Sequence, residues 1–257
     1  MSERQVVERL IRFGRSTQAA GSHKSARGPA ERFFRTNWNA WFVGLIFNQG
    51  IPYEKAQEAP YRLKQRLGHF SMRRIAATPI RELRRAIRRQ PALHRYVGKL
   101  PIWIKGATRK LVNEYDGEAV NVWEGCLTAG EVIERLDDFP GIGQKKAHLA
   151  ARVLHEEACE FHRWDQINMA VDVHVRRVWK RAGLVRDTSV EGITATASRL
   201  WPRYPGELDL PTWLVGTTWC HGRGADCEGE RHDGGRRCPL VRVCPRIGVS
   251  RRRRGRG

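Results

Sequence analysis

Four cysteines lie within 25 residues near the end of the sequence, and they are the clearest candidates for binding a metal. Six residues separate Cys220 from Cys227, ten separate Cys227 from Cys238, and five separate Cys238 from Cys244. In a reducing compartment, such crowding indicates a metal site rather than disulfides. Four thiolates suit zinc and an iron–sulfur cluster equally well on ligand chemistry alone. His232, between the second and third cysteines, is a more remote ligand candidate.

A Pro-Gly-x-Gly turn at residues 140–143 offers a site for an anion. Gly141 and Gly143 let the backbone turn sharply and keep side chains out of its path. The amides that follow lie at the start of a predicted helix, where free N–H groups and the helix dipole favour negative charge. Lysines and arginines outnumber acids by 47 to 27, a net charge of +20. We therefore expect Pro140, Gly141 and Gly143 to contact a DNA phosphate.

Helices must position these groups, because strand patterns are scarce in the sequence. Thr128 and Glu131 have the spacing of a capping box, which opens a helix that we expect to end at Phe139, just before the turn. A second helix is expected over about residues 144–157. After a loop, a further helix starts near Asp172, a residue type that commonly caps helices.

Other segments have simpler patterns. Residues 53–68 and 79–90 are expected to be helices, the latter with Thr78 as N-cap and Pro79 as its first residue. Residues 16–30 have the composition of a flexible linker. Apolar residues at helical spacing predict one buried helix face, and they are Trp38, Trp41, Phe42, Leu45 and Ile46.

Together, the turn and the string Val-Asp-x-His-x-x-Arg-Val at residues 171–178 resemble the endonuclease III branch of the helix-hairpin-helix DNA glycosylases. The resemblance implies that Asp172 is catalytic. It also places Lys145, two residues after the second glycine, where bifunctional members carry a nucleophile. There the amine attacks the sugar C1′, displaces the base and forms a Schiff base, and β-elimination then cuts the strand. Without the resemblance, Lys145 and Lys146 are both expected to contact phosphate.

The resemblance extends to two further features. Gln49 lies where the family has a glutamine that fills the gap left by the extruded base. The family's cysteine intervals are six, two and five residues, so that only the middle interval differs here. This implies a [4Fe–4S] cluster, with zinc as the alternative, and a loop in which Arg223 can meet phosphate.

The resemblance implies an all-α fold of two helical lobes, with a helix-hairpin-helix motif and a C-terminal iron–sulfur cluster loop. Residues 30–157 are expected to form a barrel-like lobe, with the hairpin over about residues 129–157. Residues 1–29 together with residues 158–245 are expected to form the cluster lobe. We expect the basic residues 246–257 to be a disordered tail.

These features predict a base-excision DNA glycosylase with AP-lyase activity, which flips a damaged or mismatched base out of double-stranded DNA. Two alternatives stay open: a monofunctional glycosylase that uses water on a uracil or thymine mismatch or an alkylated base, and a non-catalytic, structure-specific DNA-binding iron–sulfur protein. The sequence has neither a signal-peptide core nor an apolar run that could cross a bilayer. We expect a monomer in the cytoplasm, associated with the nucleoid and not with a membrane.

Overall fold

The computed structural model describes residues 2–21, 28–157, 159–221, 227 and 237–249. These residues form twelve α-helices and three 3-10 helices with no β-strand, which confirms the expected all-α fold. The α-helices are α1 (Glu3–Gly21), α2 (Pro29–Thr36), α3 (Trp38–Phe47), α4 (Tyr53–Leu67), α5 (Met72–Ala77), α6 (Ile80–Arg88), α7 (Leu100–Glu114), α8 (Ala129–Asp137), α9 (Gln144–Glu157), α10 (Val173–Arg181), α11 (Val190–Leu200) and α12 (Asp209–Thr218). The 3-10 helices are η1 (Ala119–Val122), η2 (Trp164–Gln166) and η3 (Pro205–Leu208).

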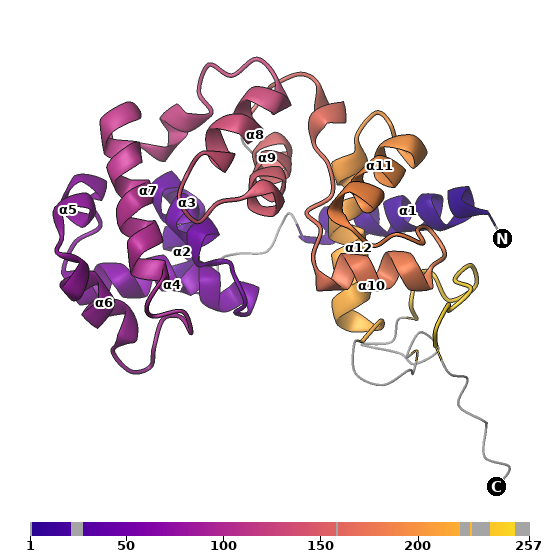
Figure 1. Ribbon diagram of the computed structural model, residues 1–257, viewed down its shortest axis with the longest axis horizontal. Coiled ribbons are helices and arrows are strands. Elements are labelled where there is room, and N and C mark those ends of the chain that lie inside the picture. Colours follow the sequence, from indigo (N-terminus) through magenta and orange to yellow (C-terminus); the bar gives the residue numbers. More distant parts are fainter. Residues whose placement is uncertain (1, 22–27, 158, 222–226, 228–236, 250–257) are drawn as a thin grey trace, which may run out of the picture. The chain divides into compact units, whose positions relative to one another are not determined.

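The chain divides into two compact units, one of residues 24–150 and one of residues 1–23 with 151–257. The first contains α2 to α8, and the second contains α1 and α10 to α12, as can be followed by colour in Figure 1. One boundary falls inside α9, whereas the sequence placed it after residue 157. No helix of the described residues is long and apolar enough to cross a membrane.

In the unit of residues 24–150, α3 is the central helix. The Asn37 side chain accepts the Ala40 N–H at 2.8 Å and so caps the helix start. Every residue from Ala40 to Phe47 is buried, because α3 packs against α2, α4 and α7. A helix that is apolar on all sides suits this position. The predicted helix is therefore confirmed, but residues 40–47 are buried on all sides and not on one face, and Trp38 is only half-buried.

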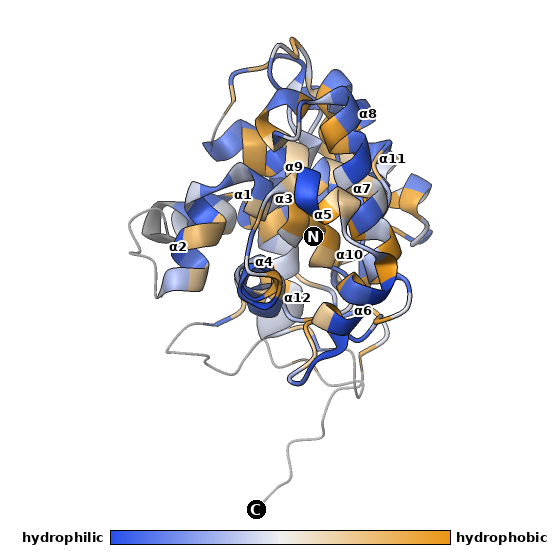
Figure 2. Cartoon of the chain, turned by 90° about the vertical axis from the view of Figure 1, so that its left-hand side faces the viewer, coloured by the Kyte–Doolittle hydropathy of each residue, from blue (hydrophilic) through white to orange (hydrophobic). Residues whose placement is uncertain are grey.

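At the surface of the same unit, α6 is amphipathic. Leu83 and Ile87 are buried, while its arginines are exposed and appear as hydrophilic positions in Figure 2. The helix predicted over residues 79–90 is thus present, but Thr78 does not cap it. Thr78 ends α5 instead, with an extended backbone (ψ 131°) that suits a residue preceding a proline, and Pro79 precedes the first turn of α6.

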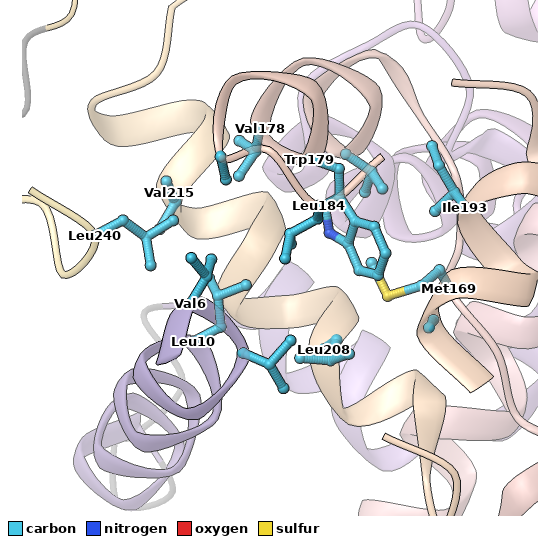
Figure 3. Packing of buried hydrophobic residues seen from close by; sticks show 14 of the residues in the cluster. Val6, Leu10, Met169, Val178, Trp179, Leu184, Ile193, Leu208, Val215 and Leu240 are labelled. Carbon is cyan, nitrogen blue, oxygen red and sulfur yellow. The ribbon is translucent and has the colours of Figure 1, made fainter. Parts of the chain in front are cut away.

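In the other unit, Trp179 of α10 lies at the centre of the core and is fully buried. Its indole Nε1 donates to Thr212 Oγ1 on α12 at 3.2 Å. Truncating such a side chain costs about 3–5 kcal/mol. Helix α1 lies beside α12 although the two are far apart in the sequence. Figure 3 shows the surrounding apolar residues, which include Val6, Leu10, Met169, Leu184, Ile193, Leu208 and Val215.

The predicted linker is shorter than expected. Residues 16–30 were predicted to be flexible, but α1 continues to Gly21 and α2 begins at Pro29. Gln18 and the two alanines after it are good helix formers, so they extend a helix whose apolar face is already packed. The linker prediction is therefore wrong for residues 16–21.

Part of the predicted tail also belongs to the fold. Of residues 246–257, the structure describes residues 246–249, where a turn is joined to the end of α10. The Ile247 N–H donates to Arg181 O at 3.0 Å. The expectation of disorder is therefore wrong for this segment, and residues 250–257 lie outside the described residues.

Candidate functional site

The predicted hairpin consists of α8, the turn of residues 138–143, and α9. The capping box is confirmed: the Thr128 hydroxyl accepts the Glu131 N–H at 3.3 Å, and the Glu131 carboxylate accepts the Thr128 N–H at 3.1 Å. Such a cap contributes about 1 kcal/mol to helix stability. Helix α8 ends at Asp137, two residues before the predicted end at Phe139, and α9 covers the predicted residues.

Packing within the unit of residues 24–150 holds the turn in place. The buried Phe139 ring lies 4.9 Å from the Phe42 ring on α3, edge to face. Ile142 is buried as well. On α7, Gly106 allows close approach, since a Cβ added there would lie 3.1 Å from Pro140 Cγ. The apolar side of the turn thus faces the protein, while Pro140 itself is exposed.

The two hairpin glycines meet different requirements. Gly141 has a φ of +84°, and an added Cβ would lie 3.0 Å from Trp103 Cβ and 3.2 Å from Ile46 Cγ2. Gly143 is exposed, and an added Cβ there would meet nothing closer than 4.0 Å. Gly141 therefore shapes the turn, while Gly143 leaves the start of α9 open. First-turn amides have no partner inside a helix, so this end of α9 suits an anion.

The two lysines of the hairpin have opposite environments. Lys145 is exposed on the first turn of α9. Lys146 is 7% exposed, and its Nζ donates to Ile46 O at 2.9 Å and to Gly141 O at 2.8 Å. Burial, with a smaller contribution from the charge of Lys145, lowers the pKa of Lys146 to about 7. This corrects the expected phosphate contact of Lys146, because protein atoms cover its ammonium group.

Gln49 lies in the loop that follows α3, and its side chain is exposed. The loop has its own supports: His94, which is 2% exposed, places Nε2 2.9 Å from Gln49 O. Its Nδ1 accepts the Tyr96 N–H at 2.9 Å, so the ring proton is on Nε2 and is donated to Gln49 O. Gly50 has a φ of +68°, and an added Cβ would lie 2.7 Å from an Arg95 guanidinium nitrogen.

Asp172 is the N-cap of α10, as the sequence predicted. Its Oδ1 accepts the N–H groups of His174 at 2.8 Å and Val175 at 2.9 Å. These bonds fix the orientation of the carboxylate, and the positive end of the helix dipole favours its charge. The side chain is half-buried, while the neighbouring Val173 is 67% exposed. The carboxylate is therefore held in one orientation close to the protein surface.

A buried acid supports the segment that leads to Asp172. The Asp209 Oδ1 accepts the Ala170 N–H at 3.1 Å. Its other oxygen, Oδ2, lies 3.7 Å from Arg152 Nε, and both side chains are almost fully buried. Arg152 also pairs with Glu156 at 2.8 Å. Nothing in the local sequence indicated this arrangement, because its members lie on α9 and α12 and in the loop before α10.

Two polar residues of the 171–178 string, His174 and Arg177, connect α10 to α12. Arg177 donates to His174 Nδ1 and to Gly216 O, both at 2.9 Å, and to Cys220 O at 2.5 Å. Gly216 permits the close contact, because an added Cβ would lie 2.7 Å from His174 Cβ. His174 and Arg177 therefore have structural roles in the described residues.

All four candidate metal ligands line one small cavity, namely Cys220, Cys227, Cys238 and Cys244. Arg181 and Arg246 line it as well, and Arg181 donates to Cys220 Sγ at 3.4 Å. Burial, and to a smaller extent the charges of the other three cysteines, raise the pKa of Cys238 to about 12. Binding a cation would therefore release protons from these thiols.

As they stand, the described residues contain no three close ligand groups arranged to hold a metal ion. Even so, four sulfur donors and two arginines around one cavity are the chemistry that a thiolate-bound cation or a negatively charged cluster requires. The donor set therefore fits such a group. Arg223 and His232 lie outside the described residues.

The two predicted catalytic residues belong to different units. Lys145 is in the unit of residues 24–150, and Asp172 is in the other. In its own unit, Lys145 is exposed directly after the hairpin turn, and Asp172 is a fixed carboxylate at a helix start.

The chain is similar to a known protein in sequence and to solved structures in fold. The chain is 28% identical to endonuclease III of a Synechocystis species over 144 residues, which are 55% of this chain and 53% of that protein. The chain thus aligns with about half the length of this curated relative. No protein-family model matches the chain.

Solved structures of DNA glycosylases have the same fold. A trapped endonuclease III–DNA covalent intermediate aligns with a TM-score of 0.67 at 19% identity, over 96% of this chain and 98% of that one. A thermostable thymine-DNA glycosylase aligns with a TM-score of 0.58 at 15% identity, over 94% of each chain. The chain therefore has the fold of endonuclease III and of these DNA glycosylases, as the family resemblance implied.

Proposed function

We propose that this protein is a base-excision DNA glycosylase with AP-lyase activity. The observation that carries the proposal is the hairpin, in which a turn held by buried residues is followed at once by a helix start with the exposed Gly143 and the exposed Lys145. The similarity to endonuclease III in sequence and fold supports it. The proposed partner is double-stranded DNA with a damaged or mismatched base, and the net charge of +20 favours such a polyanion.

The first proposed step is extrusion of the base. The backbone amides at Gly141 and Gly143 grip a phosphate, and the exposed Gln49 enters the stack where the base has left. Extrusion costs a few kcal/mol and less for a damaged or mismatched base, which gives a first level of selectivity.

In the chemical step, neutral Lys145 attacks C1′ of the extruded nucleotide. The bond between C1′ and the base breaks, and the base leaves with its electron pair and takes up a proton. The lysine nitrogen loses one proton and the ring oxygen takes one up as the sugar opens to a protonated Schiff base. Loss of a C2′ proton then forms a C2′=C3′ double bond, and the 3′-phosphate leaves with the electron pair of the C3′–O bond. The Asp172 carboxylate, oriented by its two backbone N–H bonds, stabilises positive charge on the sugar or accepts the lysine proton.

The four cysteines are proposed to hold a [4Fe–4S] cluster, with zinc as the alternative. When bound, the group would supply a structural crosslink between the chain just after α12, which carries Cys220, and the segment that carries Cys238 and Cys244. Arg181 and Arg246 would compensate the negative charge of the thiolates. No reaction step requires the group.

A panel of duplexes, each with one lesion or mismatch, tests the proposal with and without borohydride. Base release together with a covalent adduct is the expected result. Base release without an adduct would instead favour a monofunctional enzyme that uses water. Normal DNA binding with no base release from any duplex would leave only a non-catalytic DNA-binding protein.

Two substitutions at position 172 separate chemistry from folding. Asp172→Asn keeps an oxygen that accepts the N–H groups of His174 and Val175, whereas Asp172→Ala removes it. Both are expected to lower base release by about a hundredfold or more, since both remove the carboxylate. Only Asp172→Ala should also cost about 1 kcal/mol of stability in thermal unfolding. Full base release by Asp172→Asn would exclude a catalytic role for the carboxylate.

A further inference from the structure

The side chain of Lys146 is unusual, and the proposed reaction does not use it. Lys146 is an ammonium group almost completely enclosed by protein, and among the described residues no carboxylate pairs with it. A buried charge of this kind lowers stability. The lowered pKa of Lys146 expresses that cost. A gain in stability therefore does not explain why Lys146 is buried. The two backbone segments that its ammonium group joins explain it better.

Lys146 completes the end of α3. The last carbonyls of a helix have no partner inside the helix and must find one elsewhere. The Asn48 N–H donates to Gly44 O at 2.9 Å and to Leu45 O at 3.2 Å. The Gln49 N–H donates to Phe47 O at 2.7 Å. The carbonyl between them, Ile46 O, accepts from Lys146 Nζ at 2.9 Å. A cation at this place also suits the negative end of the helix dipole.

The same ammonium group also binds the hairpin. Its second hydrogen bond goes to Gly141 O at 2.8 Å, the carbonyl of the glycine that shapes the turn. Ile46 and Gly141 lie close together, since an added Gly141 Cβ would be only 3.2 Å from Ile46 Cγ2. One side chain thus joins two backbone segments that are about a hundred residues apart in sequence.

His94 holds the far end of the same loop. It donates to Gln49 O at 2.9 Å, and its ring lies 6.1 Å from the Phe47 ring. The loop of residues 47–50 is therefore bound at its start, through Ile46 O, and at Gln49 itself. Both donors are buried, so water competes poorly for these carbonyls.

We propose that Lys146 and His94 are positioning residues that couple the DNA-gripping hairpin to the Gln49 loop, so that seating the hairpin on the backbone sets the depth at which Gln49 enters the helix. This rests on the proposed function, since it assumes that the hairpin binds DNA and that Gln49 fills the gap. Neither residue touches the reacting atoms. Each acts through the backbone carbonyl that it holds.

The test uses the full-length protein and a duplex in which a tetrahydrofuran abasic analogue lies opposite 2-aminopurine. The fluorescence of 2-aminopurine rises when it loses its stacking partners, so it reports insertion at the gap without any turnover. The variants are Lys146→Met, which removes the donors but keeps an unbranched chain, and His94→Phe, which keeps a ring and removes the donor to Gln49 O. Gln49→Ala is combined with each. Affinity for an undamaged duplex is measured over a range of salt concentrations.

We expect Lys146→Met to lower the inserted fraction about tenfold, the loss typical of a hydrogen bond from a charged group. Affinity for the undamaged duplex and its salt dependence should stay within about twofold, since a buried amine contacts no phosphate. The double variant Lys146→Met/Gln49→Ala should insert no worse than Gln49→Ala alone, because the two changes remove one function. Lys146→Gln, whose amide can donate to both carbonyls, should recover part of the signal.

The coupling would be overturned if the losses of inserted fraction caused by Lys146→Met and Gln49→Ala were additive in the double variant. It would also be overturned if Lys146→Met lowered the affinity for undamaged and abasic duplexes equally. If Lys146→Met fails to fold, His94→Phe and its combination with Gln49→Ala give the same comparison. A wild-type protein that binds the abasic duplex and produces no fluorescence change would overturn the role of Gln49 and this inference together. Normal insertion with no base release from any lesion would refute the proposed enzyme alone.

Discussion

The hairpin and the cysteine cavity are stabilised in different ways, although sequence spacing identified both. The hairpin is defined by the protein's own packing, with Phe139 and Ile142 buried and Gly141 fitted between Trp103 and Ile46. The cysteine cavity is lined by thiols whose protons a bound cation would displace. The first region should therefore keep its shape without any cofactor, whereas the second is expected to depend on the metal group proposed for it.

The largest expected effect is at the cavity. Cys238→Ser should remove bound iron or zinc and destabilise the unit of residues 1–23 with 151–257 by more than about 5 kcal/mol, since metal-binding free energy is also folding free energy. Metal and sulfide analysis, together with limited proteolysis of the whole protein, measures this. The unit of residues 24–150 should stay resistant to protease.

Cys159→Ser is the matched control, because Cys159 is a half-buried cysteine of the same unit that does not line the cavity. It should retain the metal. If both substitutions lower the free energy of unfolding equally, a bound group does not stabilise the cavity. The cavity and the hairpin would then not differ in how they are stabilised.

A large effect without unfolding is expected at the hairpin. Lys145→Met should reduce the borohydride-trapped adduct by at least about a thousandfold, because no other exposed amine follows the turn directly. The variant should still fold, since the side chain is exposed. Lys55→Met, an exposed lysine on α4, serves as the control and should leave trapping intact. An adduct that persists in Lys145→Met would remove this lysine from the nucleophile role.

The buried lysine gives the hairpin a pH signature. Its pKa is about 7 in the folded protein, below the ordinary lysine value of 10.5, because burial and then Lys145 disfavour its charge. Between these pH values Lys146 carries its proton in the unfolded chain but not in the folded protein. Its contribution to the free energy of unfolding should therefore rise by about 1.4 kcal/mol per pH unit in this range and should be constant below pH 7. Denaturant unfolding of the wild type and Lys146→Met at several pH values isolates this slope. An identical pH dependence in both proteins would contradict the buried position.

The smallest effects distinguish the two glycines. Gly141→Ala should cost about 1–3 kcal/mol, because its φ of +84° and the 3.0 Å approach to Trp103 Cβ leave no room for a methyl group. Gly143→Ala has space and should cost little stability, while it weakens DNA binding by crowding the phosphate site. Thermal unfolding and duplex affinity measure the two effects. The reverse pattern would show that the turn is not held by packing.

Local signals in the sequence predicted the hairpin well. The Thr128–Glu131 capping box, the extent of α9 and the capping position of Asp172 all depend on residues within a few positions of one another. Non-local contacts were beyond such reasoning. Nothing near Lys146 indicates that Ile46 O lies within hydrogen-bonding distance, so a lysine at a helix start was assigned to phosphate.

The other errors have the same origin. Threonine is a residue type that commonly forms N-caps, but Thr78 is the C-cap of the preceding helix α5. Residues 16–21 have a linker composition, and their helix is favoured because the apolar face of α1 is packed against the core. The buried pair of Arg152 and Asp209 left no pattern, because ion pairs between distant elements have no fixed spacing.

The hydrogen-bonded carbonyls at the end of α3 limit insertions and deletions in the loop that follows this helix. Surface loops commonly accept inserted or deleted residues. Here the donors Asn48, Gln49 and Lys146 match four successive carbonyls, those of residues 44–47, and His94 binds the carbonyl of Gln49. One added residue would shift this alignment and leave a buried donor without its acceptor. Related proteins that keep both buried donors are therefore expected to keep the length of this short loop, even where its side chains differ.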